Sequence, residues 1–133
     1  MADGDDWVAT LILVVSDPPT SRDWWTGVLG AELHREYGGT SVVLRFAGMW
    51  LLLVSGGEPT DDKPDVTLAP PASRSSVDHA ITVRVSDCRG VYERVRQRGG
   101  RFLTPPHDWG AEVRCFLPDP DGHLIEFSEA RAG

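Results

Sequence analysis

The chain opens with an apolar segment. Nearly every residue from 7 to 16 is apolar or β-branched, and an Asp-Pro-Pro turn follows. A short run of this kind predicts a strand that is buried on both faces. Thr20 or Ser21 is expected to cap a helix over residues 20–29, because a side-chain oxygen there accepts hydrogen bonds from amides of the first turn. The predicted buried stripe of that helix consists of Trp24, Trp25, Val28 and Leu29.

Glycine turns then separate three further runs of strand character. These predicted strands cover residues 32–37, 41–47 and 50–54. Residues 57–76 contain four prolines among polar residues, which argues against regular strand pairing and predicts a surface linker. The first half of the chain is therefore expected to fold as β-α-β-β-β.

The same order of elements repeats after the linker. The predicted elements are a strand at 77–86, a helix at 88–98, and strands at 101–104, 112–117 and 123–128. Three landmarks recur 70 positions later: Val-Ser-Asp at 15–17 and 85–87, glycine at 30 and 100, and phenylalanine at 46 and 116. A longer turn at 118–122 raises the offset to 74, so that Trp50, Leu52 and Val54 correspond to Leu124, Glu126 and Ser128.

This repeat predicts an α+β fold made of two tandem βαβββ modules. Module one spans 7–56, the linker 57–76 and module two 77–130, within a single domain covering 1–133. A chain of 133 residues that is 41% hydrophobic is long enough to bury a core without structural metals or disulfides. The two cysteines, Cys88 and Cys115, lack paired-ligand spacing and are expected in or near that core.

Charge and hydropathy exclude two classes of partner. Thirteen basic residues against twenty acidic ones give a net charge of −7, which disfavours nucleic acid as a partner. No apolar run approaches the roughly 20 residues that span a bilayer, so no membrane partner is expected. The stretch Met1–Asp6 is acidic where a secretion signal would be basic, and we expect a cytoplasmic protein.

Two segments carry a family resemblance. SRDWWTGVLGAEL at residues 21–33 resembles an aromatic-pair helix motif, and FLPDPDGHLIEF at 116–127 resembles a closing Asp-Pro-Asp-Gly hairpin with a terminal glutamate. With the two βαβββ modules, they resemble the vicinal oxygen chelate superfamily of glyoxalases, bleomycin-resistance proteins and extradiol dioxygenases. The resemblance implies a curved mixed sheet around a ligand cavity and, in the enzymes, a divalent metal held by strands one and four of each module.

The four metal positions implied by the resemblance carry Thr10, Leu52, Ala80 and Glu126. Only Glu126 is a good ligand, so we expect no metal cofactor. The alternative is a divalent metal held by His79 and Glu126, with His107 completing a rearranged set. Strand alternation turns His79 away from the face of Ala80, which argues against that alternative.

The cavity implied by the resemblance is mostly apolar and aromatic. Within it, Arg84 is expected to pair with an anionic ligand group or with Glu126, and Trp109 to stack on a ligand at the rim. No catalytic residue is predicted, because no nucleophile motif accompanies His107 and Asp108. The predicted ligand-binding residues are Trp50, Leu52, Thr82, Arg84, His107, Trp109 and Glu126.

These expectations favour a homodimeric small-molecule binding protein of the bleomycin-resistance type. Its ligand would be a lipophilic or aromatic compound, such as an antibiotic, sequestered without a catalytic metal. The alternative is a metal-dependent lyase, isomerase or dioxygenase, which predicts stoichiometric metal. A third hypothesis, a non-catalytic partner subunit, predicts a large exposed apolar patch outside the cavity.

Overall fold

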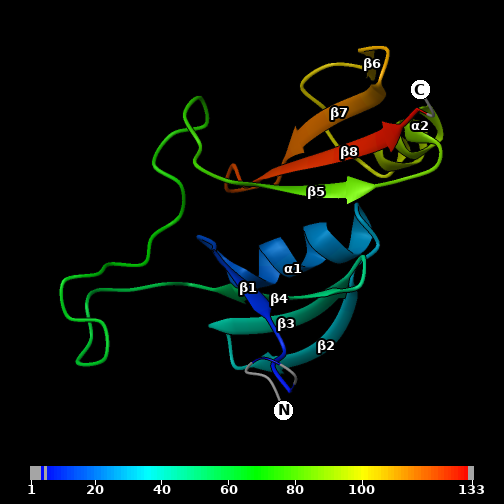
Figure 1. Ribbon diagram of the computed structural model, residues 1–133. Helices are drawn as coiled ribbons and strands as arrows, with labels where there is room; N and C mark the ends of the chain where they lie inside the picture. Colours follow the sequence, from blue (N-terminus) through cyan, green and yellow to red (C-terminus); the bar gives the residue numbers. More distant parts are fainter. Residues whose placement is uncertain (1–3, 5, 132–133) are drawn as a thin grey trace.

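Two four-stranded mixed sheets, each covered by one helix, make up the computed structural model shown in Figure 1. It describes residue 4 and residues 6–131, so most of the acidic stretch Met1–Asp6 lies outside the described residues. The elements are β1 Thr10–Val14, α1 Pro18–Gly27, β2 Glu32–Tyr37, β3 Ser41–Phe46, β4 Met49–Val54, β5 Ala80–Arg84, α2 Cys88–Gln97, β6 His107–Asp108, β7 Glu112–Pro118 and β8 Leu124–Ala130. The predicted α+β fold of tandem βαβββ modules is confirmed.

The two sheets repeat one topology. Their strand orders are β1-β4-β3-β2 and β5-β8-β7-β6, and β1 and β5 run parallel to β4 and β8. Thr10 pairs with Trp50 in the first sheet, and Ala80 pairs with Leu124 in the second. The first strands are thus 70 residues apart and the last strands 74, as the sequence repeat predicts.

Each sheet buries the face that its helix covers. Strand alternation places Leu51 and Leu53 of β4 and Ile125 of β8 in the core, all with no exposed surface. Trp25 of α1 is equally buried. The prediction that both cysteines lie in or near the core is confirmed, since Cys88 of α2 and Cys115 of β7 are both buried in it.

Three details of the expected elements are wrong. β1 is not buried on both faces, because its outer face has no covering element and leaves Ile12 49% exposed. Helix α1 begins at Pro18 instead of residue 20, because proline is pre-organised for a first helical turn. Residues 101–104 do not form a strand; only the amide of Leu103 bonds across to β7, and β6 takes the edge position instead.

The turn before β8 joins the modules. The His123 ring bonds to the carbonyl of Val14, and Asp121 accepts a hydrogen bond from the amide of Ser16. In Figure 1 the linker, drawn in green, extends away from both sheets before it reaches β5. Among the described residues, no helix has the length and apolar character needed to cross a bilayer.

Candidate functional site

The face of the second sheet opposite α2 carries a cluster of polar and aromatic side chains. Alternation along β5 places Thr82 and Arg84 on this face, and the pairing of Thr82 with Glu126 carries it onto β8. Along β7 the same face receives Arg114 and Phe116, since Phe116 pairs with Glu126. Three adjacent strands therefore supply one polar surface.

Glu126 lies at the centre of this surface. The hydroxyl of Thr82 donates a short hydrogen bond to its Oε1, and Arg114 Nε lies 3.9 Å from its Oε2. The Glu126 side chain is only 16% exposed. Both carboxylate oxygens thus already have protein partners, a hydroxyl donor and a guanidinium.

Arg114 connects Glu126 to the aromatic residues. Its Nη1 forms an ion pair with Glu112 at 2.8 Å, and its Cζ lies 5.2 Å from the ring centre of Trp109 and 5.7 Å from that of Phe116. These distances permit cation–π attraction. The short strand β6 pairs with β7 and brings His107 within 4.2 Å of Trp109, ring centre to ring centre.

Glu112 supplies a second carboxylate. Ser128 Oγ donates to its Oε2 across 2.6 Å, and this bond, together with the nearby charges of Arg114 and Arg84, holds the pKa of Glu112 below its ordinary value. Arg84 itself makes no ion pair with any residue that the structure describes. Its exposed guanidinium is therefore available to an anionic group.

Trp50 and Leu52 belong to a different surface. They lie on β4 of the first sheet, where the Trp50 ring stacks beneath Arg45, with Cζ 4.5 Å from the ring centre, and lies 4.9 Å from His34. The structure thus brings Thr82, Glu126, His107 and Trp109 together, with Arg84 beside them. No hydrogen bond or ring contact joins them to Trp50 within the described part of the chain.

Two pockets, of about 590 and 300 Å³, occur elsewhere. Both are built partly from the linker, and none of the seven predicted binding residues lines either of them. The polar surface of the second sheet is therefore separate from both of these pockets.

The four positions that a metal would use do not fit one. Thr10, Leu52 and Ala80 offer at most one hydroxyl, and Glu126 is engaged by Thr82. His79 bonds to Asp78 at 2.7 Å, and no hydrogen bond or ion pair joins it to Glu126. Within residues 4 and 6–131, no three His, Cys, Asp or Glu side chains are grouped as a metal ion requires.

Sequence reasoning missed the residues that organise this face. Glu112, Arg114 and Phe116 alternate along β7, as do Glu126 and Ser128 along β8. The signal was present as period-two alternation, but the pairing of β7 with β8 was needed to place Arg114 opposite Ser128 and beside Glu126. Arg114 was the least visible because arginines are frequent in this half of the chain.

Comparisons with known proteins find relatives in both sequence and structure. A model of the Glyoxalase/Bleomycin resistance protein/Dioxygenase superfamily matches residues 6–127. A lactoylglutathione lyase of Neisseria meningitidis is 31% identical over 92% of this chain and 89% of that protein. A crystal structure of a glyoxalase/bleomycin resistance protein/dioxygenase from Nocardioides has a TM-score of 0.77 at 24% identity, covering 100% of this chain and 89% of that one. TnmS3, an antibiotic binding protein from Streptomyces, has a TM-score of 0.69 at 18% identity, covering 98% of this chain and 100% of that one.

Proposed function

Because the chain belongs to the glyoxalase/bleomycin resistance protein/dioxygenase superfamily, we propose that it binds a small aromatic or lipophilic molecule without a catalytic metal. The outer face of the second sheet is the binding surface. The ligand is sequestered, not transformed, and an antibiotic is a fitting example. The protein acts as a homodimer in the cytoplasm.

The main support for this proposal is the position of Glu126 and the partners of its carboxylate. This residue is the only good ligand among the four positions Thr10, Leu52, Ala80 and Glu126. Its carboxylate accepts the hydroxyl of Thr82 and lies beside Arg114. An ion arriving here would have to displace both partners and would find no further donors, whereas an organic ligand needs only polar groups of fixed orientation.

The neighbouring side chains indicate how such a ligand lies. Trp109 is 60% exposed and presents a ring on which a planar group stacks. Phe116, beneath Arg114, continues the aromatic surface. Arg84, which lacks an ion pair among the described residues, then receives an anionic substituent such as a carboxylate.

A second copy is proposed to close the surface. Within one chain the faces that carry Trp50 and Trp109 share no hydrogen bond or ring contact among the described residues, and each is open. Trp50 and Leu52 of one copy would then complete the cavity above Trp109 and Glu126 of the other. The exposure of Tyr37 on the first sheet supports such a covered surface.

Tryptophan fluorescence tests the proposal. Planar compounds with and without a carboxylate, drawn from several antibiotic classes, are titrated into the protein and into the Trp109→Phe and Arg84→Ala variants. A compound that binds should cause a much smaller fluorescence change in Trp109→Phe than in the wild type. A compound with a carboxylate should bind roughly tenfold more weakly to Arg84→Ala. Trp7→Phe is the matched control, since Trp7 is exposed and has no place in the site. Absence of micromolar binding in all classes would contradict the proposal.

The second candidate function is a metal-dependent lyase. The relationship to the lactoylglutathione lyase of Neisseria meningitidis favours it, as does the presence of Glu126 at one ligand position. Elemental analysis of untagged protein purified without chelators separates the two. Near-stoichiometric transition metal, lost in the Glu126→Gln variant, would favour the lyase over sequestration.

A further inference from the structure

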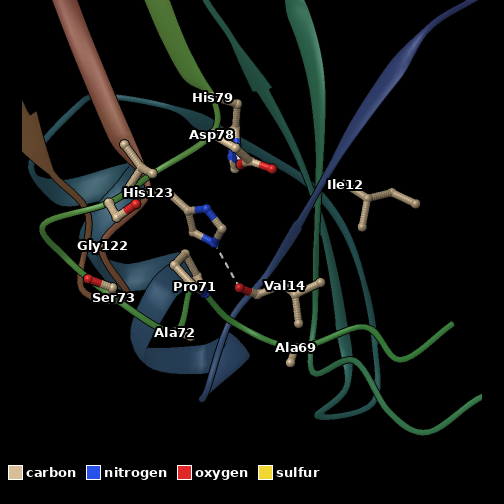
Figure 2. Close-up of a pocket in the computed structure, with 12 residues that line it drawn as sticks. Ile12, Val14, Ala69, Pro71, Ala72, Ser73, Asp78, His79, Gly122 and His123 are labelled. Carbon is tan, nitrogen blue, oxygen red and sulfur yellow. Dashed lines mark hydrogen bonds and ion pairs between the residues drawn. The ribbon is translucent and has the colours of Figure 1, made fainter.

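The larger pocket lies at the junction of the modules, apart from the binding surface proposed above. It has a volume of about 590 Å³. It is lined by β1, by residues from 69 to 79, which lead from the end of the linker to β5, and by the turn before β8 (Figure 2). None of its lining residues belongs to the face of Arg114 and Glu126. Its size lies within the range of small-molecule sites.

One side of the pocket is apolar. Its apolar lining includes Ile12 and Val14 of β1, Pro71 of the linker, and Val77 between the linker and β5. Ile12 and Val77 are 49% and 39% exposed, although both are large apolar side chains. A ligand with an apolar body would remove that surface from water, which is favourable at roughly 25 cal/mol per Å².

The other side carries a carboxylate held in place by a histidine. His79 Nδ1 lies 2.7 Å from Asp78 Oδ1, and this hydrogen bond lowers the pKa of Asp78. Asp78 is therefore an anion at neutral pH. Figure 2 shows its carboxylate directed toward the side of the pocket where Ile12 lies.

The buried ring of His123 forms the floor of the pocket. His123 is 5% exposed, and its Nε2 lies 2.7 Å from the carbonyl oxygen of Val14. Since a carbonyl only accepts, Nε2 carries the hydrogen of this bond. The Nδ1 of the same ring is buried and has no partner among the described residues, and the ring of His79 lies 5.6 Å from that of His123.

A carboxylate dominates the charge of this pocket. Its lining includes Asp78 but no lysine or arginine, and its other polar side chains are those of Ser73, Ser76, His79 and His123. We propose that the pocket binds an organic amine, whose ammonium group pairs with Asp78 and whose apolar body packs against Ile12 and Val77. This site is independent of the surface around Trp109, because the two share no residue.

Titration with benzylamine, followed by two-dimensional NMR at pH 8, tests this site. Benzyl alcohol and benzoate serve as matched probes of the same ring with a neutral or negative group. Benzylamine is expected to shift the resonances of Val77, His79 and His123 in a saturable manner, and benzoate to leave them unchanged. Asp78→Asn should weaken benzylamine binding roughly fivefold, the upper scale of an ion pair at a carboxylate whose side chain is 96% exposed.

Two variants make the outcome decisive. Ala72→Trp, at an exposed position of the rim, fills the pocket and should abolish the shifts while the rest of the spectrum stays folded. Trp109→Phe should leave the benzylamine titration unchanged, so failure here and failure of the proposed function are separable. Equal shifts with benzoate, unchanged affinity in Asp78→Asn, or shifts confined to the surroundings of Trp109 would each overturn the proposal.

Discussion

The side chain of His123 donates a hydrogen bond to the backbone carbonyl of Val14, over a distance of 2.7 Å and a separation of 109 residues. Val14 ends the first strand of module one, and His123 precedes the last strand of module two. The backbone amide of His123 is in turn held by Asp119, a buried carboxyl whose pKa is raised by its burial. This bond therefore ties the two modules together at a point removed from solvent.

Replacing His123 with phenylalanine should weaken the junction. The ring is kept, but the Val14 carbonyl loses its donor in a buried place, which costs roughly 1–3 kcal/mol. Urea unfolding followed by fluorescence would measure the loss in the free energy of unfolding. His79→Phe is the control, because His79 is exposed and makes no bond to module one. Equal unfolding midpoints for both variants would show that the bond does not stabilise the junction.

A second prediction concerns the pH dependence contributed by Glu112. The hydrogen bond from Ser128 is the largest cause of its lowered pKa, so Ser128→Ala should raise that pKa toward the ordinary glutamate value. A carboxyl whose pKa is lower in the folded state stabilises the fold at pH values above its unfolded-state pKa. This stabilisation disappears as the pH falls through the folded-state pKa. The stability difference between wild type and Ser128→Ala should therefore be full at pH 7 and shrink in acid.

Carbon-detected NMR of the side-chain carboxyls would follow the Glu112 titration directly. The same Ser128→Ala change in a Glu112→Gln background serves as control, since no carboxylate is left to titrate. A pH-dependent difference that persists in that background would assign the effect to another group.

The cysteines should be almost inert in the folded protein. Both are buried with their sulfurs 3.7 Å apart, and burial together with Cys88 raises the pKa of Cys115 to about 12. Since the thiolate is the reactive form, labelling by a disulfide reagent at pH 8 should be roughly 1000-fold slower than for a free thiol. Two thiols should react promptly in urea. Rapid labelling of the native protein, absent in Cys115→Ser, would contradict this picture.

Local sequence signals predicted the fold because they act through short-range chemistry. The offsets of 70 and 74 residues reappear in the equivalent pairings of Thr10 with Trp50 and of Ala80 with Leu124. The prediction of a strand at 101–104 was wrong because strand propensity there is not matched by a continuous pairing: Pro105 and Pro106 follow, and Leu103 makes a single backbone hydrogen bond to Phe116 of β7.

The site was predictable only in part, since it depends on contacts across strands. Thr82, Glu126, His107 and Trp109 were expected from alternation and family resemblance; the structure places them near one another through Arg114, and their role in binding stays a prediction. Arg114 was not expected, because its role follows from lying between Glu112 and Glu126. The junction pocket was invisible for the same reason: it forms where the linker crosses β1, a relation that no local pattern encodes.

Substituting alanine for Gly99 or Gly100, which follow α2, should destabilise the fold in both cases, but for different physical reasons. Gly99 has a φ of +102° with open space around it, so Gly99→Ala should cost about 1–2 kcal/mol through backbone strain alone. A Cβ on Gly100 would lie 2.5 Å from Val95 Cγ1 and 3.2 Å from Val28 of module one, and Gly100→Ala should cost roughly 1–3 kcal/mol through overpacking.

A double-mutant cycle with Val95→Ala distinguishes these causes. Removing the Val95 methyl groups should reduce the penalty of Gly100→Ala, because the nearest clashing atom is gone, and leave that of Gly99→Ala unchanged. Unfolding free energies of the five variants and wild type from urea titrations give both coupling terms. A coupling of equal size at the two glycines would mean that strain, not contact, governs both positions, and that Gly100 is not required for the approach of Val28 to module two.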